Sequence, residues 1–341
     1  MTQHKKLKHT VTAFCCVIMV LFFLLYSYLF FFENISVSSS RHAHTYDQLT
    51  GYSVTTIEDT VAPVGIRKEY RLILNNFDSS ESCLCFYLVH QYADVYIDGE
   101  LVYTLTASEN NRISDTISSN WATIPIHEND SGKELVVVLT PLYKSMTDFE
   151  PKFLVGSHYS IVVDQFKQDI PQLFIALLCV ILSIFILITQ IHFMLHTNTK
   201  TWNMLYLAGF AFLLGSWRIT DTKSSPILFA NNPLVLGYIS IGCLFLCSLF
   251  LQLYLSTCFA KKYGKQLLVL TSFSCSVTFM VWLFQIFDIA DFKQMLPISH
   301  FLLIVSVAII IIFSIICRKE VKNSRLFLIL ALGIAVDIAS F

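Results

Sequence analysis

The fold of the water-facing part of the chain is decided by the stretch Ala93-Asp94-Val95-Tyr96-Ile97-Asp98-Gly99-Glu100-Leu101-Val102-Tyr103. Asp98-Gly99 separates two tetrads rich in β-forming residues. A type I′ turn joins two hairpin strands and needs positive φ at both central residues, which Asp-Gly adopts readily. The stretch therefore predicts a β-hairpin that turns at Asp98-Gly99.

Residues 33–169 around this hairpin alternate apolar and polar side chains with a period of two, which is typical of β-strands. The other predicted strands are Glu69–Leu74, Cys83–Val89, Trp121–Ile126, Glu134–Thr140 and Ser160–Asp164. Leu135–Leu139 is apolar at every position, which predicts a central strand buried on both faces. Pro125 cannot donate to a ladder and predicts an edge or a bulge for its own strand. Several short strands of this kind predict a β-sandwich.

The composition indicates that the rest of the chain lies in a membrane. Of 341 residues, 55% are hydrophobic and 14% are charged, against about 25% charged in soluble domains. The net charge of −1 hides a division, because residues 33–169 hold 19 acidic and 9 basic residues and the remainder holds 5 and 14. The chain therefore combines an acidic, water-facing domain with a basic, apolar membrane part.

Seven apolar runs are candidates to cross a bilayer, which needs roughly 20 apolar residues. They are Val11–Phe32 and, after residue 169, about 170–195, 202–219, 233–260, 266–287, 296–317 and 326–341. Val11–Phe32 is longer than a secretory core of about 7–15 residues, which favours an uncleaved anchor, while Ser36–Ser40 leaves cleavage open. We expect an α+β membrane protein with a cytoplasmic N-terminus (1–10), an anchor (11–32), an extracytoplasmic jelly-roll-like β-sandwich sensor domain (33–169) and a multi-helix transmembrane domain (170–341).

Lysine and arginine counts set the expected orientation. With the N-terminus inside, the cytoplasmic segments hold 11 Lys and Arg and the opposite short loops hold 3, in agreement with the positive-inside rule. We expect a multi-pass protein of the cell membrane with residues 33–169 outside.

Leu326–Phe341 is 16 residues long and the chain stops there without a polar flank. We therefore expect a fragment of a longer chain. A short last helix that ends near the outer interface is the alternative.

The segment Tyr92–Tyr103, followed by Trp121–Ile126 and Gly132–Thr140, resembles jelly-roll domains related to galactose-binding and carbohydrate-binding modules. The layout of anchor, β-domain and helix block is similar to that of bacterial seven-transmembrane receptors with diverse intracellular signalling modules. In particular, it resembles Firmicute-type sensors whose cytoplasmic end is a diguanylate cyclase. The segment Gly209–Phe259, in which Trp217-Arg218 follows a helix and a long apolar helix comes next, also resembles this family. The resemblance implies a further helix and a cytoplasmic effector, which this chain does not contain.

The sequence contains no catalytic motif: neither His-Glu-x-x-His nor a phosphate-binding glycine loop nor Gly-x-Ser-x-Gly is present. We expect that the chain is not an enzyme, and we predict no cofactor and no metal site. His42-x-His44 offers too few ligands. The pair His192 and His196 has ligand spacing, but histidines beside lipid headgroups at the end of a span are the commoner case. Cys83 and Cys85 lie about 6.5–7 Å apart on a strand, at or beyond the reach of a disulfide. Buried free thiols are expected there, with a redox or metal role as the minority interpretation.

Four aromatic residues of the outer domain are candidates for ligand binding. Trp121, Tyr92, Tyr96 and Tyr103 carry rings that can stack on a sugar face, although packing in the core or on the sheet surface is the commoner role of such rings.

A second candidate site lies in the membrane part. Asp337 lies 11 residues beyond Leu326, which is about 16 Å into the last apolar run at 1.5 Å per residue and near the middle of the bilayer, where an ionised carboxylate is costly. We predict a polar switch contact between Asp337 and His300 or Arg218, with a protonated or water-bridged packing residue as the alternative.

These features favour a membrane sensory receptor in which the outer β-domain senses a small molecule, glycan or protein and acts through the helices on a cytoplasmic output. Lys167–Ile170 joins the domain to the next span with almost no linker, so a tilt of the domain reaches the helix.

Lipids of the bilayer are expected partners, a homodimer is allowed, and nucleic acid is not expected because the outer domain is acidic. A transporter or channel with a capture domain is the alternative and requires intramembrane charges or repeats. A membrane enzyme acting through Arg218–Asp221 is a third hypothesis.

Overall fold

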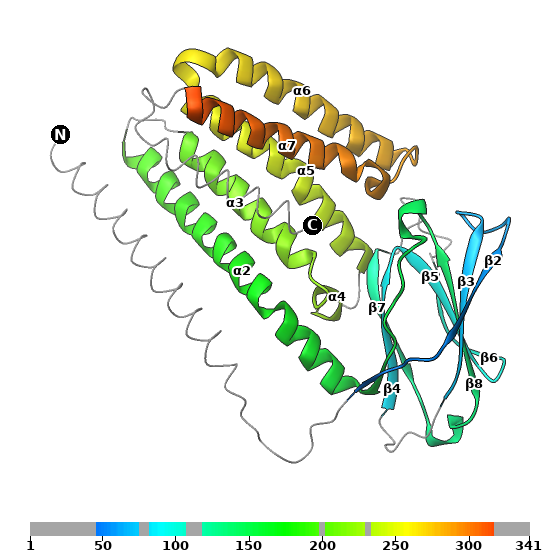
Figure 1. Cartoon of the computed structure of the whole chain (residues 1–341). Coiled ribbons are helices and arrows are strands. Elements are labelled where there is room, and N and C mark those ends of the chain that lie inside the picture. The colour runs from blue at the N-terminus through cyan, green and yellow to red at the C-terminus, as the bar shows by residue number, and fades with distance from the viewer. Residues whose placement is uncertain (1–45, 75–81, 107–117, 198–201, 229–232, 317–341) are drawn as a thin grey trace, which may run out of the picture. The chain divides into compact units, whose positions relative to one another are not determined.

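The computed structural model describes residues 46–74, 82–106, 118–197, 202–228 and 233–316. Within them the chain is mixed α+β, with nine strands first and the helices after them (Figure 1). The predicted spans Val11–Phe32 and 326–341, the pair His42 and His44, and Asp337 lie outside the described residues.

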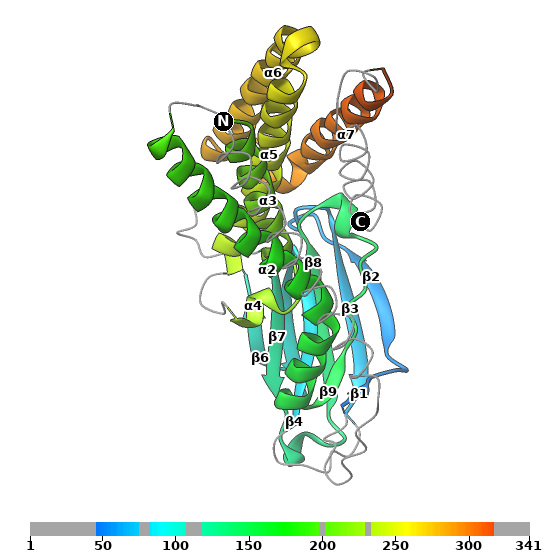
Figure 2. The ribbon, with the colours of Figure 1, turned by 90° about the vertical axis from the view of Figure 1, so that its left-hand side faces the viewer.

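The strands form two antiparallel sheets, and the neighbouring strands are seen side by side in Figure 2. The four-stranded sheet has the order β1-β9-β4-β7 and the five-stranded sheet has the order β2-β3-β8-β5-β6. Their bounds are β1 Asp47–Gln48, β2 Ser53–Glu58, β3 Ile66–Ile73, β4 Ser82–Val89, β5 Gln91–Ile97, β6 Glu100–Leu105, β7 Ser119–Pro125, β8 Glu134–Pro141 and β9 Leu154–Ser157. The region is β-sandwich-like, as the strand pattern predicts.

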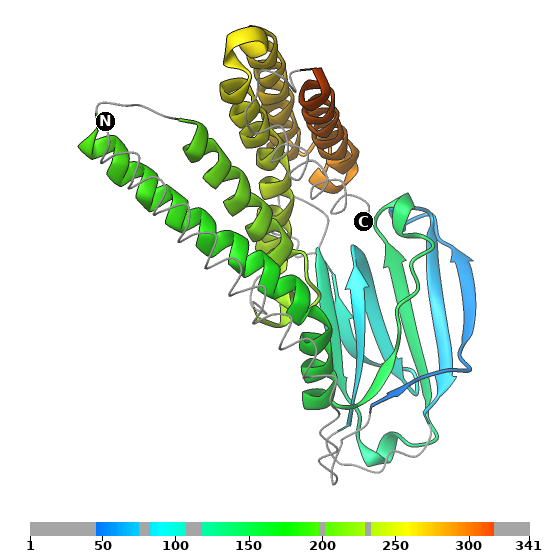
Figure 3. The same cartoon turned by 60° about the vertical axis from the view of Figure 1, so that its left-hand side comes forward.

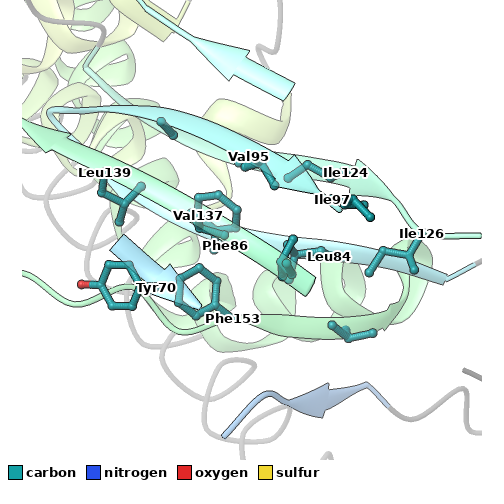
Figure 4. Packing of buried hydrophobic residues seen from close by; sticks show 14 of the residues in the cluster. Tyr70, Leu84, Phe86, Val95, Ile97, Ile124, Ile126, Val137, Leu139 and Phe153 are labelled. Atoms are coloured by element: carbon teal, nitrogen blue, oxygen red, sulfur yellow. The ribbon is translucent and has the colours of Figure 1, made fainter. Parts of the chain in front are cut away.

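The core of this region is built by inward-facing side chains from both sheets (Figure 4). Tyr70, Phe86 and Phe153 are fully buried, and the ring of Phe153 lies 5.3 Å from that of Tyr70 and 5.2 Å from that of Phe86, both edge to face. Such aromatic pairs add to the stabilisation that burial provides. Strands far apart in the chain are held together by this cluster.

The predicted hairpin is present. Asp98 and Gly99 have φ of 52° and 82°, and they connect the paired residues Ile97 and Glu100 of β5 and β6. The two positive φ values are those that a type I′ turn requires.

Replacing Gly99 by alanine is expected to lower the free energy of unfolding by about 1–2 kcal/mol, because a side chain in the left-handed region is strained. No atom lies within 4 Å of a Cβ built on Gly99, so the loss comes from the backbone alone. Chemical unfolding of the full chain in detergent micelles measures it. Glu100→Ala, at the exposed neighbour, is the control, and equal stabilities of the two variants would contradict the prediction.

Two predictions about single strands are confirmed and one is wrong. β7, which contains Pro125 as its last residue, lies at the edge of its sheet, and β8 is the central strand of the five-stranded sheet. However, β8 is not buried on both faces: Leu135, Val137 and Leu139 are buried, whereas Val136 and Val138 are half-buried. The outer face of this sheet is open, because no described element packs over it to bury these two valines.

The predicted strand Ser160–Asp164 is wrong, because these residues are helical. Helix α2 spans His158–His196 and therefore begins well before the predicted span at about 170. Ile161 and Gln165 are both buried, one helical turn apart, which is the spacing of a helix face rather than of a strand. Tertiary packing here overrides the β-propensity of Ile161, Val162 and Val163.

The helices after the strands are α2, α3 Asn203–Thr220, α4 Ser225–Leu228, α5 Pro233–Cys258, α6 Ala260–Ile286 and α7 Phe292–Ile316. Among the described residues, four segments are long and apolar enough to cross a membrane: His158–His196, Val235–Cys258, Tyr263–Ile286 and Phe292–Phe313. The 18-residue helix α3 covers the predicted span 202–219 but is not one of the four. These four helices fit a membrane protein.

Helix α3 packs between α2 and α5 (Figure 3). A Cβ at Gly215 would lie 2.7 Å from the carbonyl oxygen of Ala176 in α2, and a Cβ at Gly209 would lie 2.3 Å from the ring of Phe250 in α5. The two glycines therefore allow the close approach that small residues provide between membrane helices.

Candidate functional site

The outer face of the five-stranded sheet carries a hollow of about 460 Å³. Strands β2, β3, β5 and β8 and the two turns beside them supply its lining: Ile57, Glu58, Asp59, Arg67, Glu69, Arg71, Asp94, Tyr96, Gly99, Glu134, Val136 and Val138. The same alternation that points Val137 into the core points Val136 and Val138 into this hollow. The hollow is large enough for a small polar ligand.

Charged side chains dominate the lining of the hollow. Arg67 forms an ion pair with Asp59, and Arg71 pairs with Glu69 at 2.8 Å and with Glu134 at 3.4 Å. The hydrogen bond with Glu69 raises the pKa of Arg71 above its usual value. With five carboxylates and two guanidinium groups in the lining, the hollow is negative overall and disfavours anions.

The four predicted aromatic residues do not come together. Tyr96 lines the hollow, and Tyr92 lies on the same outward side of β5. Tyr103 of β6 packs instead against the core, where burial raises its pKa. Trp121 belongs to β7 in the other sheet. The polar lining was missed, although Arg67, Glu69 and Arg71 stand at alternate positions of β3 and a period-two count of charges would have found them.

A second group of residues joins the strands to the helices. The indole Nε1 of Trp121 donates to the carbonyl oxygen of Lys223 at 2.9 Å, and its ring lies 5.3 Å from that of Tyr87. The Lys223 ammonium lies 5.6 Å from the centre of the Tyr87 ring, within range of a cation–π interaction. Burial raises the pKa of Tyr87 to about 12. Trp121 is therefore a contact residue toward the segment that follows α3.

The same segment is held by helix α2. The carboxylate Oδ2 of Asp169 accepts hydrogen bonds from the backbone N–H of Ser224 at 2.8 Å and from its hydroxyl at 2.7 Å. Ser224 is fully buried, and its hydroxyl also lies 3.4 Å from the carbonyl oxygen of Gln165, so the backbone N–H is the group that depends most on this carboxylate. Residues 221–228 are thus fixed both to the four-stranded sheet and to α2.

A third contact joins the five-stranded sheet side to α6 and α7. The Tyr143 hydroxyl donates to Oδ2 of Asp291 at 2.5 Å, and the Gln285 amide donates to Oδ1 at 3.3 Å. The side-chain oxygen Oε1 of Gln285 in turn accepts a hydrogen bond from the backbone N–H of Phe292. One carboxylate therefore links the loop after β8, the end of α6 and the start of α7.

His90 lies beside this contact. Its side chain is 7% exposed, its φ is 50°, and its ring lies 5.6 Å from that of Tyr143. It lines a cavity of about 10 Å³ together with Ser118, Gly237, Tyr238, Ile241, Gln285, Phe292 and Lys293, which is the space of about one water molecule. Burial, and then the charge of Lys293, lower the pKa of His90 to about 3. The imidazole is therefore neutral in this environment.

Close approach of helix and strand at this cavity requires a glycine. A Cβ at Gly237 of α5 would lie 2.3 Å from the hydroxyl oxygen of Ser118. We call the three contacts, with His90, the junction: Trp121, Tyr87 and Lys223; Asp169 and Ser224; Tyr143, Asp291 and Gln285.

The predicted membrane switch is only partly described. The Arg218 guanidinium lies 5.3 Å from the Trp217 ring, and the Arg218 carbonyl accepts from Gln172 at 3.4 Å. His300 lies on α7. Asp337 is outside the described residues, so the switch stays a prediction. The rings of His192 and His196 lie 4.2 Å apart, and in the described part of the chain no three His, Cys, Asp or Glu residues could hold a metal ion.

Comparisons of the chain with protein-family models, with curated proteins and with solved structures find no match.

Proposed function

We propose that the chain is the sensory and membrane part of a receptor: a ligand binds the outer hollow, and the junction passes its effect to the helices. The observation that carries the proposal is the junction itself. Trp121 and Tyr143 link the β-domain to segments between the helices, and the Asp169–Ser224 pair links one of these segments to α2, in each case through directional hydrogen bonds rather than through apolar contact alone. Directional bonds are lost when the partners rotate, so such a contact responds to small movements.

The finer architecture belongs to the proposal. The strand orders in the two sheets support a jelly roll, an architecture of two packed sheets. We propose six spans after the β-domain, with α3 as the second, and an N-terminus on the cytoplasmic side. The count of 11 against 3 basic residues supports this orientation. The output on the cytoplasmic side, a diguanylate cyclase by resemblance, is part of the same proposal, and the chain itself is not proposed as an enzyme.

The hollow favours a neutral or cationic ligand with several hydrogen-bonding groups. Glu58 and Asp94 are not ion-paired in the hollow, Asp94 accepting only from the Thr104 hydroxyl at 2.7 Å. Both can accept bonds from hydroxyl or ammonium groups. Tyr96 lines the same hollow, and its ring offers a face for a sugar or a cation.

Binding changes the helices only if the ligand favours one of two junction states. A ligand shifts an equilibrium by its differential affinity for the two states and by no more. β8 makes this possible, because Val136 and Val138 line the hollow while the loop that follows the strand carries Tyr143 to Asp291. A movement of β8 on binding therefore reaches α6 and α7 directly.

The test uses the full chain in nanodiscs, with a panel of neutral mono- and disaccharides and with spermidine as probes. Calorimetric binding should weaken roughly tenfold in Tyr96→Ala and in Asp94→Asn, which is about 1.4 kcal/mol. Tyr159→Ala, at a tyrosine that is 72% exposed on α2, is the matched control. Bound probe should also slow hydrogen exchange in residues 221–228 and 290–294.

Each arm has an outcome against the proposal. Failure of every probe to bind rejects the ligand class, and binding that Tyr96→Ala leaves unchanged rejects the hollow. Binding without any change of exchange in residues 221–228 and 290–294 rejects transmission through the junction.

One observation favours the alternative of a transporter or channel. Helices α5, α6 and α7 bury uncharged polar side chains, and Gln252 donates to the Ser306 hydroxyl at 3.0 Å. Among the residues that the structure describes, the side-chain carbonyl oxygen of Gln252 and the hydroxyls of Ser274 and Thr278 are buried without a partner, and polar groups inside a helix bundle are typical of transport pathways. Solute flux through proteoliposomes that Gln252→Leu abolishes would support this alternative over the receptor.

A further inference from the structure

Two cysteine thiols face each other on one strand of the four-stranded sheet. Cys83 and Cys85 of β4 point to the same side, and their sulfur atoms lie 3.4 Å apart. Both are free thiols, 5% and 1% exposed. The sulfur of Cys83 also lies 3.4 Å from the carbonyl oxygen of Gly156. Neither the hollow nor the junction uses this pair.

The pair lies under the beginning of helix α2. Ile161, which is 3% exposed, packs on the two cysteines together with Tyr46, Trp121 and Leu154. The Tyr46 hydroxyl donates to Asp164 at 2.5 Å and so ties the edge of this cover to the helix. The thiols are therefore covered by the first turns of the helix that leads from the strands into the membrane part.

The local geometry lets the two sulfurs approach. Residues two apart on a strand have Cα atoms about 6.6 Å apart, at the upper end of the 4.4–6.8 Å range that disulfides span, so the strand must adjust locally to bring the Cβ atoms together. The residue paired with Cys83 on β9 is Gly156, so no side chain lies directly opposite Cys83 on that strand. The sulfurs must move closer by little more than 1 Å to reach bonding distance.

The two thiols differ in acidity. The hydrogen bond from Cys83 lowers the pKa of Cys85, and the same bond, with burial, raises the pKa of Cys83. Cys85 is thus the better nucleophile at neutral pH, because the thiolate is the reactive form.

We propose that Cys83 and Cys85 are a redox-sensitive dithiol that forms an intrastrand disulfide by exchange with a small-molecule disulfide when the first turns of α2 lift. The Cys85 thiolate attacks one sulfur of the reagent, whose S–S bond breaks and releases one thiol. Cys83 then loses its proton and attacks the Cys85 sulfur, which releases the second thiol. Two protein thiols are oxidised and one disulfide is reduced, so electrons and protons balance.

The rate at which this pair is oxidised depends on how often the first turns of α2 open. Since both sulfurs are covered, a reagent reaches them only through local opening, and the rate of reaction follows the open population. A Cys83–Cys85 disulfide would join Cα atoms at the long end of the distance range that disulfides span. Strained disulfides of this kind are readily reduced. The inference does not require the proposed receptor function, because the reaction of the two thiols needs no ligand in the hollow, although Trp121 belongs both to the cover and to the junction.

The test treats the full chain in detergent micelles with 2,2′-dithiodipyridine and follows the peptide that contains both cysteines by mass spectrometry. We expect this peptide to lose about 2 Da and to carry no thiopyridyl adduct, because the second thiol displaces the first adduct. Cys83→Ser and Cys85→Ser should each keep one adduct on the remaining cysteine. Ile161→Ala should speed the reaction roughly tenfold or more, whereas Ile175→Ala, at a 54% exposed position of the same helix, should leave the rate unchanged.

Two results would overturn the proposal. The first is a stable adduct on both cysteines of the wild-type peptide, which would mean that the thiols react without joining. The second is a native peptide that stays unreacted while the same peptide reacts after unfolding in denaturant, which would mean that the cover never opens.

Discussion

Lowering the pH from 7.5 to 5 is expected to increase the equilibrium constant for opening of the junction around His90 by a factor of roughly 30. This factor corresponds to about 2 kcal/mol of lost stability of the closed junction. His90 is 7% exposed and lies in the small cavity that Lys293 also lines. A second positive charge in this cavity lacks the solvation that water gives it, so the protonated ring favours an open junction.

The direction of the effect follows from the pKa of His90, which is about 3 in the closed junction against 6.5 for an exposed histidine. The closed state holds a neutral ring, and its stability is fully present above pH 6.5. It is lost progressively as the pH falls from 6.5 toward 3, because only the open state binds a proton in this range. The complete loss amounts to about 5 kcal/mol.

The measurement is hydrogen exchange of the full chain in nanodiscs, corrected for the intrinsic effect of pH on exchange. Protection in residues 87–91 and 290–294 should fall roughly 30-fold in the wild type between pH 7.5 and 5. His90→Asn keeps a polar side chain that tolerates the positive φ of 50°, and its protection should change less than threefold. Tyr143 and Asp291 face the same region and are unaltered in both proteins.

His158→Asn is the control, since His158 is an exposed histidine at the start of α2. It should behave as the wild type. An equal loss of protection in the His90→Asn protein would show that another group causes the response to acid.

Replacing Asp169 by alanine is expected to weaken the attachment of residues 221–228 by about 2–4 kcal/mol. The carboxylate accepts both from the backbone N–H and from the hydroxyl of Ser224. Without it the backbone N–H of this fully buried residue has lost its acceptor, which costs about 1–3 kcal/mol. The hydroxyl keeps only the longer contact of 3.4 Å with the carbonyl oxygen of Gln165, which adds a smaller loss of about 1 kcal/mol. Asp169→Asn keeps one acceptor oxygen and should lose about half as much.

Hydrogen exchange of residues 221–228 measures this loss, which corresponds to roughly 30-fold to 1000-fold faster exchange in Asp169→Ala. Asp148→Ala removes an equal charge from an exposed position before α2 and is the matched control. If the junction transmits a signal, Asp169→Ala should also abolish the effect of a hollow-bound probe on these residues while the probe still binds. Unchanged exchange would mean that the Lys223 contacts alone hold the segment.

Local features of the molecule were predictable, and features that depend on long-range pairing were not. The turn at Asp98-Gly99 follows from two neighbouring residues that adopt positive φ readily, glycine because it has no side chain. The edge position of β7 follows from the missing N–H of Pro125. By contrast, Ile161-Val162-Val163 has the composition of a strand, and only its packing on Cys83 and Cys85 makes the helical form the stable one. The hollow was missed for the same reason, because it requires four strands to lie in register.

The sequence by itself determined that an acidic β-domain and long apolar helices make up this chain, because period-two alternation and apolar length are properties of neighbouring residues. Tertiary structure alone decided which distant side chains meet: Trp121 reaches Lys223, and Tyr143 reaches Asp291. The physical reason is that hydrogen bonds and burial join residues more than a hundred positions apart as readily as neighbours, and no local pattern records such a pair.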